Sequence, residues 1–294
     1  HASGVNRADC LIRAGKYKLP PGASPILGVE VSGIVDKVGD QVTRWSSGDR
    51  VAALLNGGGY AQWAVAHESL AFSLPNHLSF EEMAAIPEVF LTAFQLINWI
   101  SHVQPLETVL IHAGASGIGT AAIQIVKQMG AHSIVTVGSK EKAAYCQKLG
   151  AKHAILRYET IFDKEILDLT NNQGIDVILD CVGQAYWHQN IRTLKQGGRI
   201  VLYGALSGDH VKDFNLSDFY LKWPTVIGTT LFPRSLEYKA KLVADFLAFA
   251  NPLFEKKLLE PIVYKTFPFA NAAEAHKTME ANQNIGKIIL NEFT

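Results

Sequence analysis

Short apolar runs alternate with longer stretches of helical period through the middle of the chain, from about Glu88 to about residue 230. Such runs are typical of strands buried on both faces, and the stretches between them are typical of helices that cross back over a parallel sheet. The predicted strands are Thr108 to Ala113, Ser133 to Val137, Ala154 to Leu156, Val177 to Asp180, Arg199 to Tyr203 and Thr225 to Thr229. Helices are expected to begin near Ile118, Lys140, Phe162 and Tyr186. The pattern predicts an α/β fold with a doubly wound parallel sheet.

The chain before this region has a different pattern, in which short β-branched runs are broken by glycine and proline. Strands are predicted at Ile34 to Val38, Arg50 to Leu55 and Tyr60 to Val65, which indicates a β-rich unit. After the doubly wound region a helix is expected at Leu236 to Phe249 and one more strand at Gly286 to Leu290.

A glycine-rich turn follows the first predicted strand of the parallel sheet. Gly114, Ser116 and Gly119 occupy the three positions of the GxGxxG pattern, and a helix follows. Small residues allow the backbone to approach a pyrophosphate, whose charge then lies at the free N–H groups of the helix N-terminus. Serine at the middle position departs from the pattern, but its hydroxyl can donate to phosphate and Gly117 beside it is also small. The strand before the turn and the helix after it favour dinucleotide binding over a plain strand-to-helix turn.

The end of the next strand indicates which dinucleotide is bound. An NAD enzyme places an acidic residue there to hold the ribose 2′-hydroxyl. This chain has Gly138 and Ser139 instead, and Lys142 follows in the first helical turn, where it could reach a 2′-phosphate. Glu141 argues the other way, although a glutamate in a first turn also favours the helix dipole. NADPH is preferred, and a solvated surface lysine remains the alternative interpretation of Lys142.

Composition narrows the class further. The 294 residues carry 27 Lys and Arg against 27 Asp and Glu, so no net positive field favours nucleic acid or an anionic membrane. Cys10, Cys146 and Cys181 form no CxxC pair, which favours a reducing compartment over a disulfide framework. The most apolar stretch, Ala84 to Ile100, contains too many polar residues for a bilayer span, and we expect a soluble protein.

Signatures of other enzyme classes are missing from the sequence. It has no Tyr-x-x-x-Lys, no HExxH, and no GxSxG around Ser116. His112, at the end of the first parallel strand, is expected to be a structural histidine and not a catalytic base.

Several motifs along the chain match one family. They are Gly4-Val5-Asn6-Arg7-Ala8-Asp9, Pro25 to Gly33, Gly48-Asp49-Arg50-Val51, His112 to Gly119, Asp180-Cys181-Val182-Gly183, Gly197-Gly198-Arg199 and Asn284 to Leu290. With them the chain resembles the medium-chain dehydrogenase/reductase superfamily over essentially its whole length. Within the superfamily it is most similar to zinc-free quinone oxidoreductases, the p53-inducible enzymes related to ζ-crystallin. The resemblance implies a Rossmann NADPH-binding domain over residues 88–230, inserted into a GroES-like catalytic domain formed by residues 1–87 and by the return at 231–294.

The resemblance also implies roles for individual residues. Zinc alcohol dehydrogenases of the superfamily have a cysteine near the present Asn6 and a histidine at the present Val29, so no metal site is expected. Asn6 and Tyr17 would line the nicotinamide and substrate pocket. The other implied contacts are Ser116, Gly117 and Ile118 to the pyrophosphate, Gly138, Ser139, Lys142 and Tyr158 to the 2′-phosphate, and Asn284 and Lys287 to the cofactor from the tail. From the residues alone, Asn6 could equally cap a turn and Tyr17 could be a half-buried aromatic.

The activity expected from this resemblance is NADPH-dependent, zinc-independent reduction of quinones in the cytoplasm by a homodimer joined through the strand at Thr225 to Thr229. An enoyl or enone reductase and a non-catalytic NADPH-binding protein are the alternatives. Family members usually have strands ahead of the Gly4 to Asp9 motif. This chain starts close to that motif, so either an N-terminal piece of the protein lies outside the sequence or this form lacks part of the catalytic domain.

Overall fold

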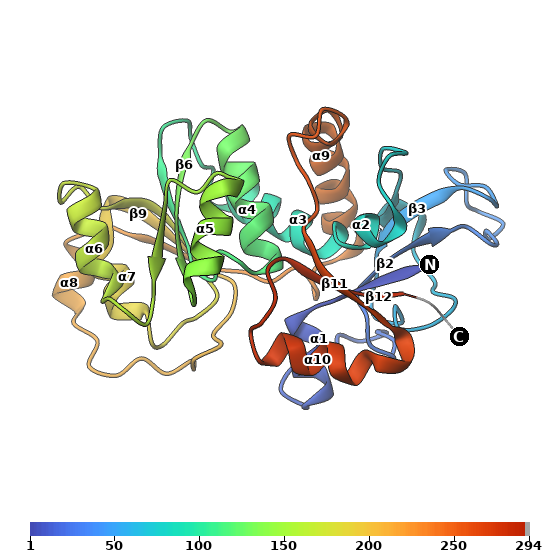
Figure 1. Ribbon diagram of the computed structural model, residues 1–294, viewed down its shortest axis with the longest axis horizontal. Coiled ribbons are helices and arrows are strands. Elements are labelled where there is room, and N and C mark those ends of the chain that lie inside the picture. The colour runs from blue at the N-terminus through green and yellow to red at the C-terminus, as the bar shows by residue number, and fades with distance from the viewer. Residues whose placement is uncertain (292–294) are drawn as a thin grey trace. The chain divides into compact units, whose positions relative to one another are not determined.

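A computed structural model describes residues 1–291, which form two compact units. The central unit is Thr92–Thr230, and the terminal unit combines residues 1–91 with the chain from Leu231 onward. Each unit is built around one six-stranded sheet (Figure 1). None of the helices within residues 1–291 combines the length and apolarity that a bilayer crossing needs.

The central unit has the predicted doubly wound parallel sheet. Its strands are β5 (Thr108–Ile111), β6 (His132–Val137), β7 (His153–Leu156), β8 (Ile175–Asp180), β9 (Leu194–Leu202) and β10 (Thr225–Gly228). Its helices are α4 (Gly117–Gln128), α5 (Lys140–Leu149), α6 (Phe162–Leu169), α7 (Trp187–Thr193) and α8 (Leu216–Tyr220). The strand order is β10-β9-β8-β5-β6-β7 and every pair is parallel. The order reverses between β5 and β8, and ligands of such sheets bind beyond the carboxyl ends of the strands at that point.

The apolar runs of these strands explain the stability of the sheet. Val109, Leu110, Ile111 and Ile178 are completely buried, as expected of strands covered on both faces. Burying each such side chain contributes roughly 1.5–3 kcal/mol to folding.

The terminal unit contains a mostly antiparallel sheet with the order β11-β12-β1-β2-β3-β4. Its strands are β1 (Ala2–Val5), β2 (Glu30–Ile34), β3 (Arg50–Leu54), β4 (Ala71–Phe72), β11 (Val263–Pro268) and β12 (Lys287–Asn291). Its helices are α1 (Arg7–Arg13), η1 (Glu68–Leu70), α2 (Phe80–Ala84), α9 (Leu236–Glu255), η3 (Phe269–Asn271) and α10 (Ala272–Glu280), and α3 (Pro87–Phe94) leads into the central π-helix η2 (Gln95–Ile100).

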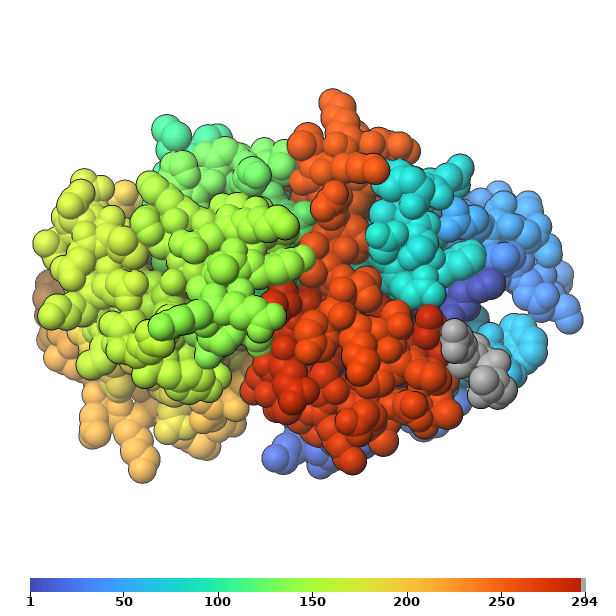
Figure 2. All heavy atoms as spheres, viewed as in Figure 1, coloured from blue at the N-terminus to red at the C-terminus, as the bar shows by residue number. Residues whose placement is uncertain are grey.

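The two ends of the described chain meet in this sheet. β1 pairs with β12 in antiparallel register, and Val5 lies opposite Ile288. The orange-red atoms of the segment around α10 cover the face of the terminal unit that is turned to the viewer in Figure 2. Residues almost 290 positions apart in the sequence therefore become neighbours, which is what assembles the polar cluster described below.

Two strand predictions in the first segment were wrong. The strand at Glu30–Ile34 ends where the predicted one begins, and Tyr60 to Val65 is irregular. A strand needs a partner, and β3 takes its partner on that side from Ala71 and Phe72 of β4. Val65 is 95% exposed, although a β-branched side chain in a strand would be expected to be buried.

Candidate functional site

The turn after β5 is built so closely that two of its glycines cannot be replaced. A Cβ on Gly119 would lie 2.4 Å from the carbonyl oxygen of Gly114, and one on Gly114 would lie 2.5 Å from Cβ of Val135. Both distances are far below van der Waals contact, so the turn requires hydrogen at these positions. Ser116 caps α4, because its Oγ accepts a hydrogen bond of 3.0 Å from the N–H of Gly119.

The helix start beyond Ser116 can accept an anion. Within residues 1–291, the N–H groups of Gly117 and Ile118 donate to no protein acceptor, as is usual for the first turn of a helix. Ser116, Gly117 and Ile118 are partly exposed, whereas Gly119 and Thr120 are buried. The predicted pyrophosphate residues thus lie at an accessible N-terminus of a 12-residue helix, where the helix dipole favours negative charge.

Three of the four residues predicted for the 2′-phosphate, Gly138, Ser139 and Lys142, follow β6, and the fourth, Tyr158, follows the neighbouring strand β7. Ser139 caps α5, since its Oγ accepts a hydrogen bond of 3.3 Å from the N–H of Lys142. A Cβ on exposed Gly138 would make only ordinary contacts, at 3.6 Å to the ring of Tyr158 and 3.7 Å to Nε of Arg157. Gly138 is therefore exposed but bordered, since the ring of Tyr158 and the guanidinium of Arg157 both lie within van der Waals contact of its Cβ position. Burial first, and then the charge of nearby Arg157, lower the pKa of Lys142.

A buried polar chain lies under these loops. His112 Nε2 donates a hydrogen bond of 2.8 Å to Asn190 Oδ1, and Nδ1 lies 3.0 Å from Thr136 Oγ1. Asn190 Nδ2 donates to Asp180 at 3.0 Å. Burial lowers the pKa of His112, so the ring is neutral. The other carboxylate oxygen of Asp180 accepts hydrogen bonds from the N–H groups of Val182 and Gly183. His112 is thus a structural residue, and the chain it belongs to links the strands that lie on either side of the sheet's reversal point.

In the terminal unit a lysine, a glutamate and an asparagine form one buried cluster. Lys287 Nζ lies 2.6 Å from Glu30 Oε1 and donates to Asn6 Oδ1 and to the carbonyl of Val5, both at 2.7 Å. Asn6 Nδ2 donates to the same Glu30 oxygen at 2.7 Å. All three side chains are buried. The structure therefore brings two predicted site residues, Asn6 and Lys287, into direct contact, with Glu30 as a partner for which the sequence motifs predicted no role.

Two further carboxylates adjoin this cluster. The N–H of Glu88 donates to Glu30 Oε2 at 2.7 Å, while Glu88 Oε2 accepts no hydrogen bond from any side chain or N–H of the described residues. Burial, and then the negative charge of Glu30, raise the pKa of Glu88 to about 7. Asp9 accepts hydrogen bonds from the N–H groups of Asn6 and Gly28, but burial still raises its pKa to about 6.

Tyr17 and Asn284 lie elsewhere in the terminal unit. Half-buried Tyr17 approaches Phe232, with 6.1 Å between ring centroids. The ammonium of Lys239 lies 5.7 Å from the same ring and donates to Asn56 Oδ1 at 2.8 Å. Asn284 is buried, and its Nδ2 donates to the carbonyl of Gly286 at 2.7 Å, which fixes the turn before β12.

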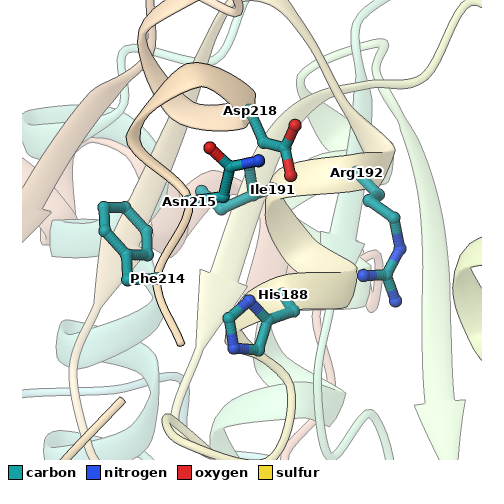
Figure 3. Close-up of a pocket in the computed structure, with 6 residues that line it drawn as sticks. All are labelled: His188, Ile191, Arg192, Phe214, Asn215 and Asp218. Carbon is teal, nitrogen blue, oxygen red and sulfur yellow. The ribbon is translucent and has the colours of Figure 1, made fainter. Parts of the chain in front are cut away.

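A small hollow in the central unit is not the site. It lies between α7 and the segment that enters α8, and is lined by His188, Ile191, Arg192, Phe214, Asn215 and Asp218 (Figure 3). Two of its polar side chains already have protein partners: His188 bonds the carbonyl of Lys212, and Arg192 pairs with Asp163 at 2.6 Å. None of the residues that line the hollow belongs to the glycine-rich turn or to the end of β6.

Two known protein families match separate parts of the chain. The alcohol dehydrogenase GroES-like domain matches residues 1–76, and the zinc-binding dehydrogenase family matches residues 117–248. Quinone oxidoreductase of Homo sapiens is 30% identical over 295 aligned residues, which cover 99% of this chain and 87% of that protein. The chain belongs to the medium-chain dehydrogenase/reductase superfamily.

Solved structures of this superfamily resemble the chain over nearly all of its length. Escherichia coli quinone oxidoreductase complexed with NADPH has a TM-score of 0.88 at 30% identity, with coverage of 99% of this chain and 89% of that one. CurK enoyl reductase has a TM-score of 0.86 at 27% identity, with coverage of 99% and 88%. The GroES-like and Rossmann folds are therefore confirmed, and the chain is an oxidoreductase that depends on a nicotinamide cofactor.

The residues of this superfamily member do not fit the catalytic zinc of the alcohol dehydrogenases. Val29 offers no donor atom, and the side-chain oxygen of Asn6 is already bound by the ammonium of Lys287. A zinc ion there would lie beside a buried positive charge. No three His, Cys, Asp or Glu side chains among the described residues are gathered so that they could hold a metal ion.

Proposed function

We propose that the chain is an NADPH-dependent quinone reductase that works without a metal. The observation that carries the choice of cofactor is the end of β6, where exposed Gly138 stands in place of an acidic residue, Tyr158 borders it, and Lys142 follows in the first turn of α5. An acidic residue at this position would repel a 2′-phosphate, whereas a glycine beside a lysine favours it. The quinone as acceptor is supported by relatives that carry that name and are about 30% identical over most of their length.

The chain's own residues would bind and orient the reactants. A bound nicotinamide supplies hydride, and a quinone is electrophilic enough to accept it without a Lewis acid. Ser116 and the free N–H groups of Gly117 and Ile118 would hold the pyrophosphate. Asn6 would act at the nicotinamide end from a position fixed by Lys287 and Glu30. Asn284 would support that position indirectly, because it holds the turn that leads to Lys287.

Tyr17 would orient the quinone by a hydrogen bond, and the final proton would come from Tyr17 or from solvent. The support for this role is its half-buried position beside Phe232, which gives an aromatic wall with one polar group. Tyr17→Phe keeps the wall and removes the hydroxyl. With a quinone we expect a loss of roughly 2- to 13-fold in rate, as for one neutral hydrogen bond. A loss of about 10²- to 10⁴-fold would identify Tyr17 as an obligatory general acid instead.

An enoyl or enone reductase is the second candidate, and it is favoured by the similarity to CurK enoyl reductase at a TM-score of 0.86. In that reaction a carbon must be protonated, so the tyrosine would matter more. Tyr17→Phe tested with a quinone and an enone side by side separates the two mechanisms. A protein that binds NADPH tightly and turns over neither acceptor would be a non-catalytic binding protein.

We further propose a homodimer joined through β10, in a reducing cytoplasmic compartment. β10 pairs only with β9 within residues 1–291, which leaves one edge of the sheet open. Leu221, Trp223 and Val226 are 57%, 69% and 37% exposed beside that edge. Pairing of two such edges across a two-fold axis would bury both. Three buried cysteines, none in a disulfide, support the compartment.

A further inference from the structure

An arginine that the motifs do not single out lies at the proposed 2′-phosphate position. Arg157 follows β7, which pairs with β6 in parallel register so that Leu156 lies opposite Val137. Its N–H donates to the carbonyl of Val137 at 3.0 Å. The sheet thus places Arg157 directly beside Gly138, at the carboxyl ends of two neighbouring strands.

The guanidinium of Arg157 is turned over Gly138. Its Nε and Nη2 lie 3.7 and 3.9 Å from the point that a Cβ of Gly138 would occupy. Cζ lies 4.2 Å from the ring centroid of Tyr158, and Nη2 donates to the hydroxyl of that tyrosine. The ring and the hydroxyl of Tyr158 therefore both contact the guanidinium, as in cation–π pairs.

Arg157 and Lys142 place two positive charges around one small space. After burial, Arg157 is the largest influence that lowers the pKa of Lys142, and it exceeds the opposing effect of Glu141. None of the ion pairs among residues 1–291 gives Arg157 a carboxylate partner. Two cations that are close enough to influence each other, beside an exposed glycine, favour a ligand group with more than one negative charge. A phosphate monoester has this charge, and its oxygens match the fork of a guanidinium.

We propose that Arg157 is a specificity-determining residue that binds the 2′-phosphate of NADPH through its guanidinium fork, held in place by Tyr158. The proposal rests on the proposed NADPH function and adds to it a residue whose contribution is directional, whereas Lys142 contributes a point charge. Arg157→Lys should therefore recover only part of the affinity, although it retains the charge.

The test measures binding of cofactor fragments and requires no turnover. Adenosine 2′,5′-bisphosphate and adenosine 5′-monophosphate are titrated calorimetrically into wild type, Arg157→Met, Arg157→Lys and Lys148→Met. The last variant removes an exposed cation from the same unit and controls for net charge. We expect Arg157→Met to weaken the bisphosphate by about 10- to 150-fold, the range for a charged hydrogen bond, and the monophosphate by less than about 2-fold. Arg157→Lys should lie between, and Lys148→Met should match wild type.

The outcomes separate the two proposals. If wild type binds both fragments equally, the NADPH function itself is wrong. If wild type prefers the bisphosphate and Arg157→Met keeps that preference, the NADPH function stands and the role of Arg157 is overturned. Equal weakening of both fragments would also overturn it, because Arg157 would then act on the adenosine or on the fold. Thermal unfolding of each variant shows whether the fold is retained.

Discussion

The ammonium of Lys287 and the carboxylate of Glu30 lie 2.6 Å apart, with exposures of 3% and 0% for their side chains. Burial of both charges is unfavourable unless they are paired and their remaining hydrogen-bonding groups are satisfied. Here Val5, Asn6 and the N–H of Glu88 supply the additional bonds. The pair joins β2 to β12, and both of its members hydrogen-bond the side chain of Asn6.

Removal of either charge from this pair should destabilise the protein strongly. Lys287→Met or Glu30→Gln should each cost about 3–5 kcal/mol in the free energy of unfolding, because one buried charge loses its partner. The double variant should lose clearly less free energy of unfolding than the two single variants lose together. Denaturant unfolding of the three variants measures this coupling. As a control, Lys195→Met breaks a surface pair with Asp176 and should cost less than about 1 kcal/mol. A strictly additive double variant would show that the two side chains are not coupled.

The raised pKa of Glu88 predicts a pH dependence of stability. The folded value is about 7 against an ordinary value of 4.5, so the folded protein holds the proton more tightly than the unfolded chain. The stabilising contribution is complete below pH 4.5 and is lost as pH rises toward and through 7.

Glu88→Gln removes this titration. The variant should therefore gain stability relative to wild type between about pH 4.5 and pH 8, by up to about 3 kcal/mol. Because Asp9 titrates in the same direction in both proteins, the comparison isolates Glu88. Urea unfolding at pH 5 and pH 8 gives the difference. A constant difference between the two proteins across this range would contradict the raised pKa.

Lys142→Ala should reduce NADPH binding by about 10- to 150-fold, since one charged hydrogen bond to the 2′-phosphate is lost. NADH binding should change little. Quenching of protein fluorescence by each cofactor measures both affinities. A similar reduction for both cofactors would mean that Lys142 acts on the fold or on the shared adenosine. No change in the affinity for either cofactor would mean that Lys142 is a solvated surface lysine.

The open edge of β10 predicts the oligomeric state. Val226→Lys places a charge on the strand that is proposed to pair, which should convert a dimer to a monomer and leave the central unit folded. Multi-angle light scattering at micromolar concentration measures the mass. A wild-type monomer would refute the interface, and so would a Val226→Lys protein that remained dimeric.

The sequence predicted features that depend on neighbouring residues better than features that depend on contacts between distant parts of the chain. The glycine-rich turn and the parallel strands were predicted because their pattern is contained within about ten consecutive residues. The strands at Ile34 to Val38 and Tyr60 to Val65 were wrong because a strand depends on a partner whose position is not encoded locally.

The cluster of Asn6, Glu30 and Lys287 could likewise not be predicted from local sequence. Asn6 and Lys287 were predicted through family motifs, but their mutual contact joins residues 281 positions apart. Glu30 stood inside a family motif without a role, and its contacts with Asn6 and Lys287 depend on the pairing of β1 with β2 and β12. Arg157 had a possible signal, since it precedes Tyr158 at the end of a strand. Its proximity to Gly138 depends on the register of β6 and β7.

The choice of acceptor and cofactor by the wild-type protein tests the proposed function most directly. Oxidation of NADPH and of NADH is followed with an ortho-quinone, a para-quinone and a 2-enoyl thioester, each with and without a metal chelator. A metal-independent NADPH:quinone reductase should show the highest kcat/KM for NADPH with a quinone, a value for NADH lower by at least about 10-fold, and no effect of the chelator. A higher kcat/KM with the enoyl thioester, or activity that chelation abolishes, would contradict this function.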